Sequence, residues 1–247
     1  MKRQQYSWKA AFTLIELLVV ISIIAILASL LMPALARSKA VAKRVACMNQ
    51  QRQLMAATLL YIDDNEGYFP PRYLGTDPAQ PGWPGRLNFY LQNTRLLLCP
   101  EDPTRLPSLG TGLTSANFAN PADAAPRSYI MNGWNDYFLF PEGREFDFMF
   151  LRTNVMKQAY VSEPSETIVF GEKKPESNHY FMDFLEDDGN ALNELLWNMH
   201  GSKALDPSSG GSVYAYVDGH VEFVKAGGTF EPVNQWATLP EVRVQRR

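Results

Sequence analysis

The chain has few of the residues that catalytic and metal sites usually need. Its 247 residues include two cysteines and three histidines. There is no CxxC pair, and no cysteine has a histidine close to it in the sequence. No serine or cysteine lies in a nucleophile motif, and no glycine-rich phosphate loop follows a predicted strand. These absences exclude the common catalytic motifs, and we expect that the protein is not an enzyme.

Basic residues are scarce beyond residue 52. Residues 1–52 hold eight of the 23 Lys and Arg but one of the 26 Asp and Glu, which leaves residues 53–247 with 15 basic and 25 acidic residues. Nucleic-acid binding needs clustered Lys and Arg on the binding domain. The acidic remainder therefore argues against a nucleic-acid partner.

Charge is absent altogether between Glu16 and Arg37. At about 1.5 Å per residue, a helix over residues 12–36 reaches somewhat beyond the ~30 Å hydrocarbon core of a bilayer. A core helix of a soluble protein is rarely so long and apolar on every face. The segment therefore predicts a transmembrane helix. Its orientation does not follow from charge, because basic residues flank both ends in nearly equal number.

Glu16 lies just inside the apolar run. An ionised side chain deep in lipid costs about 2.5–3.5 kcal/mol even on a lenient insertion scale. The carboxylate therefore needs a partner, or it snorkels to the head groups.

The N-terminus resembles a known family at these residues. A short basic leader, residues 1–11, ends in a small residue and is followed by Phe12 and the apolar run with Glu16. This pattern resembles the class III signal of type IV pilins and type II secretion pseudopilins. The resemblance implies that prepilin peptidase cuts between Ala11 and Phe12 and methylates the new amino terminus. The family usually has glycine where this chain has Ala11.

The resemblance also implies a single-pass inner-membrane protein. Its head would lie in the periplasm or outside the cell, and its partners would be other pilin or pseudopilin subunits. Cleavage would create an ammonium on Phe12 that can neutralise Glu16 of a neighbouring subunit and so set the register of assembly. A second reading remains, because Ala34-Leu35-Ala36 resembles the small-x-small site of an ordinary secretory signal, cut after Ala36.

Residues 37–66 predict an amphipathic stem helix. Apolar residues recur at three- and four-residue steps and predict the face that packs on the head: Val41, Val45, Met48, Met55, Leu59 and Ile62. An acidic run ends the helix, with Gly67 as a left-handed cap. The run lacks the spacing of an EF-hand, which favours a solvated helix end over a calcium site.

The two cysteines are Cys47 on the stem and Cys99 in the head. An even pair in an exported domain suggests a disulfide, which would clamp stem to head. On the chain-entropy model, closing a loop of ~50 residues contributes roughly 4 kcal/mol. The alternative is two separate thiols.

Residues 67–247 predict a loop-rich globular head. Residues 127–132 and 167–172 have the composition of strands, and a short helix is expected near residues 85–93. Alternation over residues 212–225 predicts a β-hairpin, with Asp218-Gly219 as a type I′ turn. The expected fold is α+β, in which the long N-terminal helix packs on a small antiparallel sheet.

The hairpin carries a second resemblance. His200 followed by Val217–His220 resembles the C-terminal "H-X9-DG" segment of prepilin-related proteins, with a longer intervening stretch. His200, Asp218 and His220 could meet at one sheet edge and hold a metal, although turn and hydrogen-bonding roles are favoured. The acidic segment 183–190 indicates an exposed loop, with calcium as a lesser alternative.

The sequence thus predicts a structural subunit of a type II secretion pseudopilus or type IV-like pilus, without a resident cofactor. The alternative is a membrane-anchored surface domain that binds a ligand or calcium and does not polymerise.

Overall fold

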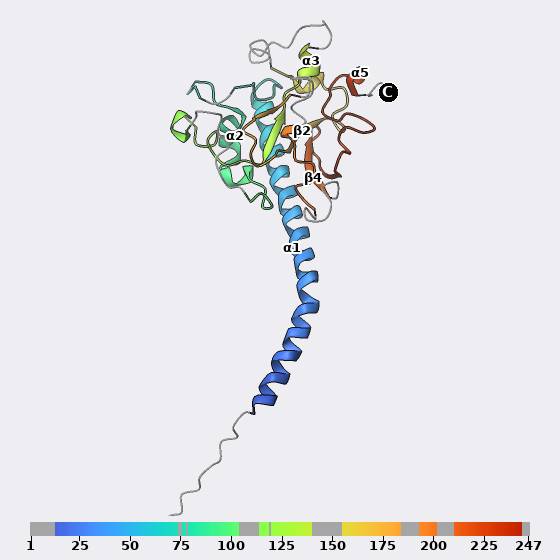
Figure 1. The fold of residues 1–247 in the computed structure, drawn as a ribbon. Coiled ribbons are helices and arrows are strands. Elements are labelled where there is room, and N and C mark those ends of the chain that lie inside the picture. The colour runs from blue at the N-terminus through green and yellow to red at the C-terminus, as the bar shows by residue number, and fades with distance from the viewer. Residues whose placement is uncertain are drawn as a thin grey trace, which may run out of the picture. The chain divides into compact units, whose positions relative to one another are not determined.

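A computed structural model describes residues 13–73, 76–77, 79–103, 114–118, 120–139, 155–183, 193–201 and 210–243 (Figure 1). The chain divides into two compact units, residues 1–42 and residues 43–247. Helix α1, Leu14–Asp64, begins in the first unit and ends in the second.

Helix α1 joins the predicted membrane segment and the predicted stem in one element of 51 residues, which continues through Pro33. The helix ends where Gly67 takes a φ of +87°. Glu66 before it is left-handed as well, with a φ of +56°, and the N–H of Gly67 donates to the carbonyl of Ile62 at 2.9 Å, the longer of the two bonds of a Schellman end. The predicted glycine cap is confirmed.

The head contains a five-stranded sheet of order β3-β1-β2-β4-β5. Its strands are β1 (Tyr129–Asn132), β2 (Ile168–Glu172), β3 (Phe181–Met182), β4 (Gly211–Tyr216) and β5 (Val221–Lys225). Neighbouring strands are antiparallel except β1 and β3, which are parallel. The α+β fold is confirmed, but the expected all-antiparallel sheet is wrong at β3, because the chain crosses from β2 to the far side of β1. A two-residue strand is too short to show alternation in the sequence.

The remaining helices are short. They are α2 (Trp83–Leu91), α3 (Asn135–Leu139), α5 (Pro240–Arg243) and the 3-10 turns η1 (Thr94–Leu97), η2 (Ser115–Asn117) and η4 (Gln158–Tyr160). Helix α2 confirms the short helix expected near residues 85–93. Asp123 binds its N-terminus, accepting N–H groups from Gly82 at 3.2 Å and Gly85 at 2.8 Å.

Alternation along β4 divides the core into two clusters. Val213 and Ala215 belong to the cluster that includes the buried residues of α1. Tyr214 and Tyr216 point to the opposite face, where they pack in a cluster with Trp236. The C-terminal segment therefore covers the face of the sheet that α1 does not, and both faces of the hairpin strand β4 are buried.

The hairpin of β4 and β5 is confirmed, but its predicted turn type is wrong. A type I′ turn needs positive φ at both central residues. Gly219 has a φ of +97°, whereas Asp218 is not among the residues with positive φ. The strands are joined instead by residues 217–220, where the N–H of Gly219 donates to the carbonyl of Tyr216 at 2.9 Å.

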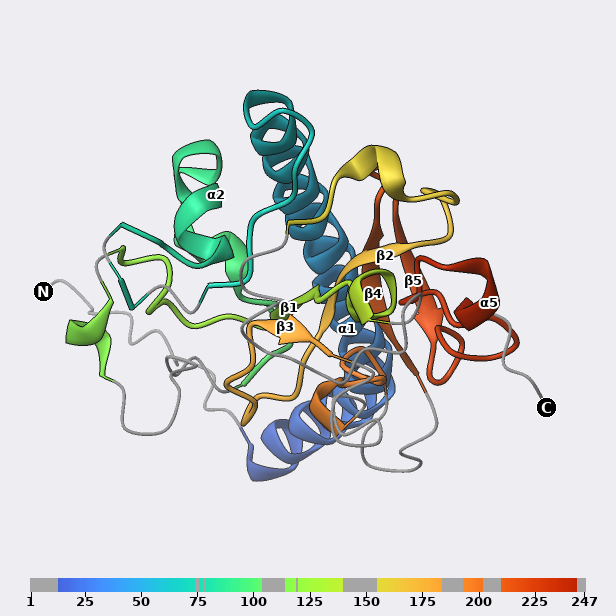
Figure 2. The same cartoon turned by 90° about the horizontal axis from the view of Figure 1, so that it is seen from above.

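The second half of α1 packs beside the sheet (Figures 1 and 2). Gln51 is fully buried and donates from Nε2 to the carbonyl of Val213 on β4 at 2.8 Å. Leu54 is fully buried as well, whereas Val41 and Val45 are each 49% exposed. The predicted face is confirmed at Met55 and Ile62, which are buried, and at Met48 and Leu59, which pack against the core; Val41 and Val45 are its exceptions. The buried Gln51 and Leu54 make the packed face wider than predicted.

Candidate functional site

The N-terminal site begins at Thr13, the residue before α1. The N–H and Oγ1 of Thr13 both donate to Glu16 Oε2, at 2.9 Å and 2.7 Å. In return the N–H of Glu16 donates to Thr13 Oγ1 at 3.2 Å. This reciprocal pair is a capping box, which satisfies free N–H groups at the start of the helix. Ala11 and Phe12 lie outside the described residues, so pairing between the Phe12 ammonium and Glu16 stays a prediction.

Helix α1 is apolar and uncovered over its first half. Its most apolar 18-residue window has a mean hydropathy of 2.9 and is not buried in the structure. By length and composition α1 is long and apolar enough to cross a membrane. Such a surface requires lipid, or the same helix of other subunits, to remove it from water.

The two cysteines lie close together in the head, as free and buried thiols. Cys47 comes from α1, and Cys99 follows η1 after the apolar run of residues 96–98. The predicted stem-to-head contact is therefore present. The disulfide is not shown and stays a prediction.

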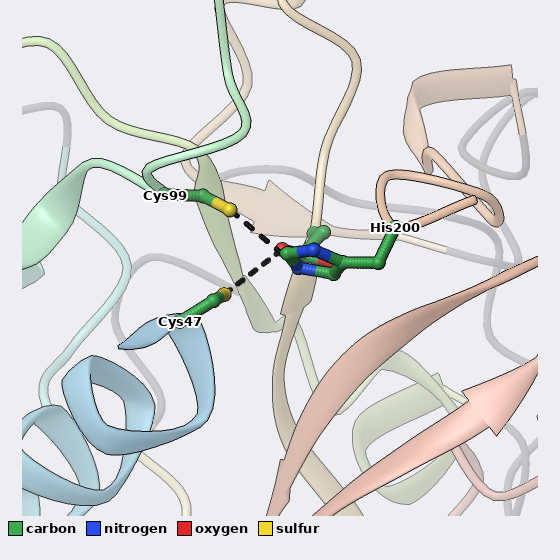
Figure 3. A group of neighbouring side chains, drawn as sticks. Cys47, Cys99 and His200 are labelled. Carbon is green, nitrogen blue, oxygen red and sulfur yellow. Dashed lines mark hydrogen bonds and ion pairs between the residues drawn. The ribbon is translucent and has the colours of Figure 1, made fainter. Parts of the chain in front are cut away.

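The thiols are part of a larger group of ligand-type side chains, shown in part in Figure 3. Their candidate ligand atoms all lie within 4.8 Å of one another. We call this group the buried cluster; it consists of Cys47, Cys99, Glu172 and His200.

Short contacts join the members of the buried cluster. Glu172 Oε1 lies 3.0 Å from His200 Nε2 and 3.1 Å from Cys47 Sγ. Cys99 Sγ lies 3.5 Å from the same nitrogen of His200. In Figure 3 both sulfur atoms and the imidazole point toward one another.

Backbone contacts hold the histidine and the glutamate of the buried cluster. The N–H of Val213 donates to Glu172 Oε2 at 2.9 Å, which leaves Oε1 facing the other members. His200 and Gly211 exchange both backbone hydrogen bonds, at 2.9 Å and 3.1 Å. These contacts fix Glu172 and His200 at the start of β4.

Contacts around the sulfur atoms hold the two cysteines. The Oγ of Ser128 accepts the backbone N–H of Cys99 at 2.9 Å. The hydroxyl of Tyr129 lies 3.3 Å from Cys47 Sγ. Neighbours of this kind orient the side chains to which they bind.

The low-dielectric surroundings change the protonation of the buried cluster. Burial, then the neighbouring Cys99 and the charge of Glu172, raise the pKa of the Cys47 thiol well above its ordinary value. Burial opposes the charge on His200, but its contacts with Cys99 and Glu172 outweigh burial and raise its pKa to about 10. Without a cation, the cluster therefore holds a protonated imidazole against the Glu172 carboxylate.

The structure does not bring His200 together with Asp218 and His220. His200 pairs with Gly211 at the start of β4, and Asp218 follows the end of that strand. Instead His220 Nδ1 lies 2.6 Å from Asp218 Oδ1 in the exposed turn. The three residues that were the lesser metal alternative therefore do not form one site, and Asp218 and His220 have the turn role that the sequence favoured.

Two of the acidic residues considered for calcium have other partners in the structure. Asp183 is buried and paired with Arg72 through both carboxylate oxygens, with Arg72 Nη2 at 2.6 Å from Oδ2. Asp64 accepts the hydroxyl of Tyr90 at 2.8 Å. Residues 184–192 lie outside the described residues.

Sequence reasoning missed Glu172 as a member of the buried cluster. Glu172 is the last residue of β2, and the sequence shows it only as a charge at the end of an apolar run. The structure shows that Glu172 is fully buried, and a buried carboxylate needs a partner. The sequence alone does not reveal this burial. Members of the buried cluster that contact one another lie 28 to 125 residues apart along the chain. No local sequence pattern therefore connects them.

Comparison with known proteins agrees with the N-terminal site. A family model of the prokaryotic N-terminal methylation motif matches residues 9–32. No curated protein and no solved structure matches the chain. The chain therefore carries a type IV pilin-like prepilin signal, which points to a structural subunit. The H-X9-DG subgroup stays a prediction.

Proposed function

We propose that the protein is a structural subunit of a type II secretion pseudopilus or a type IV-like pilus. The methylation motif at residues 9–32 is the observation that carries the proposal. The uncovered apolar half of α1 supports it, because that surface suits a membrane before assembly and a bundle of identical helices after assembly. Prepilin peptidase and other pilin-like subunits are the partners, and the head faces the periplasm or the cell exterior.

Assembly depends on Glu16 and the amino terminus that cleavage creates. The capping box makes two donors of Thr13 available to the carboxylate, but both are uncharged. An ammonium on Phe12 of a neighbouring subunit adds the opposite charge, which matters most where water is excluded. The charge of Glu16 is thus unpaired in the single subunit and is neutralised by the neighbouring ammonium in the fibre.

Mass spectrometry of the mature N-terminus tests the proposal. The protein is purified from a host with an active prepilin peptidase and, as a control, from the same host without it. We expect N-methylated Phe12 in the first case and retention of Met1 in the second. A start at Arg37, or Met1 in both hosts, would overturn the proposal.

A membrane-anchored domain that never polymerises is the second candidate. The observation in its favour is the capping box, because a carboxylate with local donors does not require a neighbouring subunit. Cross-linking in intact cells separates the two functions. Ladders linked through the stem favour the fibre, whereas monomers alone favour the tethered domain.

A further inference from the structure

The buried cluster unites four side chains that are all ligands for the same kind of metal ion. They come from four separate parts of the head: α1, the segment after η1, the end of β2, and the residue that pairs with the start of β4. We propose that the buried cluster is a structural zinc site, in which one ion ties α1 to the sheet. The proposal does not depend on whether the protein polymerises.

The spacing of the ligand atoms suits a tetrahedral ion. Zinc bonds of about 2.0–2.3 Å place the four donors of a tetrahedron roughly 3.3–3.8 Å apart. Glu172 Oε1 lies 3.1 Å from Cys47 Sγ, and Cys99 Sγ lies 3.5 Å from His200 Nε2. All the separations in the buried cluster are 4.8 Å or less, so small movements of these side chains bring the four ligand atoms to the spacing of a tetrahedral ion.

The ligand types select zinc over calcium or magnesium. Thiolate and imidazole ligands are soft or intermediate donors, whereas calcium and magnesium take oxygen donors almost exclusively. A site with two sulfur atoms, one nitrogen and one oxygen matches the set that zinc accepts. Because all four side chains are buried, the site is closed, as structural zinc sites are.

Zinc would give the two sulfur atoms stronger partners than they have in the structure. Cys47 Sγ lies 3.1 Å from Glu172 Oε1 and 3.3 Å from the hydroxyl of Tyr129, and Cys99 Sγ lies 3.5 Å from His200 Nε2, which are the weak hydrogen bonds that sulfur makes. When zinc binds, the two thiols and the protonated His200 each release a proton to solvent, so that two thiolates, the Glu172 carboxylate and the neutral Nε2 of His200 hold the ion. Every member then has the same strong partner.

Residues next to the buried cluster contact two of its side chains, in the way that outer hydrogen bonds orient metal ligands. Val213 donates to the Glu172 oxygen that faces away from the cluster. The hydroxyl of Tyr129 lies within hydrogen-bond distance of Cys47 Sγ and can donate to a thiolate there. The Val213 contact leaves Oε1 of Glu172 available to the ion, and the Tyr129 contact is made to Cys47 Sγ, which has a further lone pair for the ion.

Metal content of the full-length protein in detergent is the first test. The protein is produced in zinc-supplemented medium, freed of loose metal and analysed for zinc, iron and copper by mass spectrometry. We expect about one zinc per chain in the wild type and a loss of roughly tenfold or more in Cys99→Ser and His200→Gln. His220→Gln is the matched control, because that histidine is exposed and outside the cluster, and it keeps the metal.

Cobalt keeps the proposal testable if a variant fails to fold. Co²⁺ added to the metal-free wild type is expected to give sulfur-to-cobalt charge-transfer bands and the strong visible bands of tetrahedral coordination. Zinc then displaces it and removes both sets of bands. A spectrum of octahedral cobalt without sulfur bands would overturn the site.

Alkylation of thiols separates the zinc site from the disulfide. Zinc-bound thiols are expected to react slowly in the folded protein and to take up two labels after denaturation with a chelator. Uptake of no label without reductant would show a disulfide and overturn the proposal. A metal-free wild type with two rapidly reactive thiols would overturn it as well, as would one equivalent of iron or copper in place of zinc.

Discussion

At the scale of single residues, Glu16 has two roles, in the helix cap and in assembly, that can be tested separately. Its carboxylate closes a capping box with Thr13, and its charge is the feature that a neighbouring ammonium would neutralise. Glutamine also closes a capping box but carries no charge. The role in the helix and the role in assembly can therefore be tested with different substitutions.

We expect Glu16→Gln, like Glu16→Ala, to leave helix formation and cleavage intact and to abolish incorporation into fibres. Thr13→Ala is the control, because it removes the side-chain half of the cap, at a cost of about 1 kcal/mol, and keeps the charge. Fibres are quantified by shearing and immunoblotting, and cleavage by mass spectrometry. Normal fibres from Glu16→Gln, with none from Thr13→Ala, would assign Glu16 to capping alone.

Asp123 gives a prediction about pH. Burial raises its pKa from 3.8 to about 6, against the opposing effects of the Gly85 and Gly82 N–H groups and the charges of Arg127 and Arg86. Between these two values the folded protein holds a proton that the unfolded chain releases. This residue's contribution to stability therefore falls as pH rises through that window.

The stability of the wild type relative to Asp123→Asn should thus decrease from pH 3.8 to about 6, by at most about 3 kcal/mol. Urea denaturation of both proteins in detergent across this window gives the difference directly. The exposed Asp63→Asn is the control. A difference that is constant with pH, or that grows as pH rises, would contradict the prediction.

At the scale of elements, α1 has two halves with different surroundings. The first half is an exposed apolar surface, whereas the second half supplies fully buried residues to the core of the head. Leu54 is fully buried, and Leu60 on the same part of the helix is 56% exposed. The same substitution, made separately at each position, measures how much packing on the head contributes to the free energy of unfolding.

We expect Leu54→Ala to lower the free energy of unfolding by about 2–5 kcal/mol, because it leaves a cavity in a close-packed core. Leu60→Ala should change it by no more than about 0.5 kcal/mol, since both residues are good helix formers at an exposed position. Chemical denaturation followed by the fluorescence of the buried tryptophans measures both. Equal effects would mean that α1 does not pack on the head in the way described.

At the scale of the whole molecule, the compact unit that begins at residue 43 does not coincide with the head expected from the sequence to begin at residue 67. The difference is the second half of α1. That half contributes apolar side chains to the larger core cluster, among them Leu54, Met55, Tyr61 and Ile62. It also contributes Cys47 to the buried cluster.

A fragment of residues 43–247 should therefore fold without the membrane segment, and a fragment of residues 68–247 should not. Removing the helix exposes one face of the sheet to water and deletes part of the larger core cluster of the described residues. Near-UV circular dichroism and the cooperativity of thermal unfolding test both fragments. A cooperative transition in the shorter fragment would contradict the prediction.

Features formed by residues that are close along the chain were predicted from the sequence more often than features formed by distant residues. Glu16 and Thr13 are three residues apart, and Gly67 lies directly after the helix that it caps. A short segment of sequence therefore contains all the residues that form the helix start, and another contains those that form the helix end. The hairpin of residues 212–225 is similar, because its alternation and its turn lie within one segment. Even there, the turn type was wrong, because backbone angles at Asp218 depend on how residues 217–220 meet the rest of the head.

Short stretches of sequence were enough to predict the long apolar helix, the prepilin signal, the helix end and the strands long enough to show alternation, since each depends on neighbours within a turn or a strand. The contacts of the folded head, in contrast, set that Cys47 and Gln51 are buried on α1, that β3 runs parallel to β1, and that Glu172 joins His200 and both cysteines. Those outcomes depend on contacts between residues far apart in the chain, where the burial of a polar group is settled by what the whole fold places beside it.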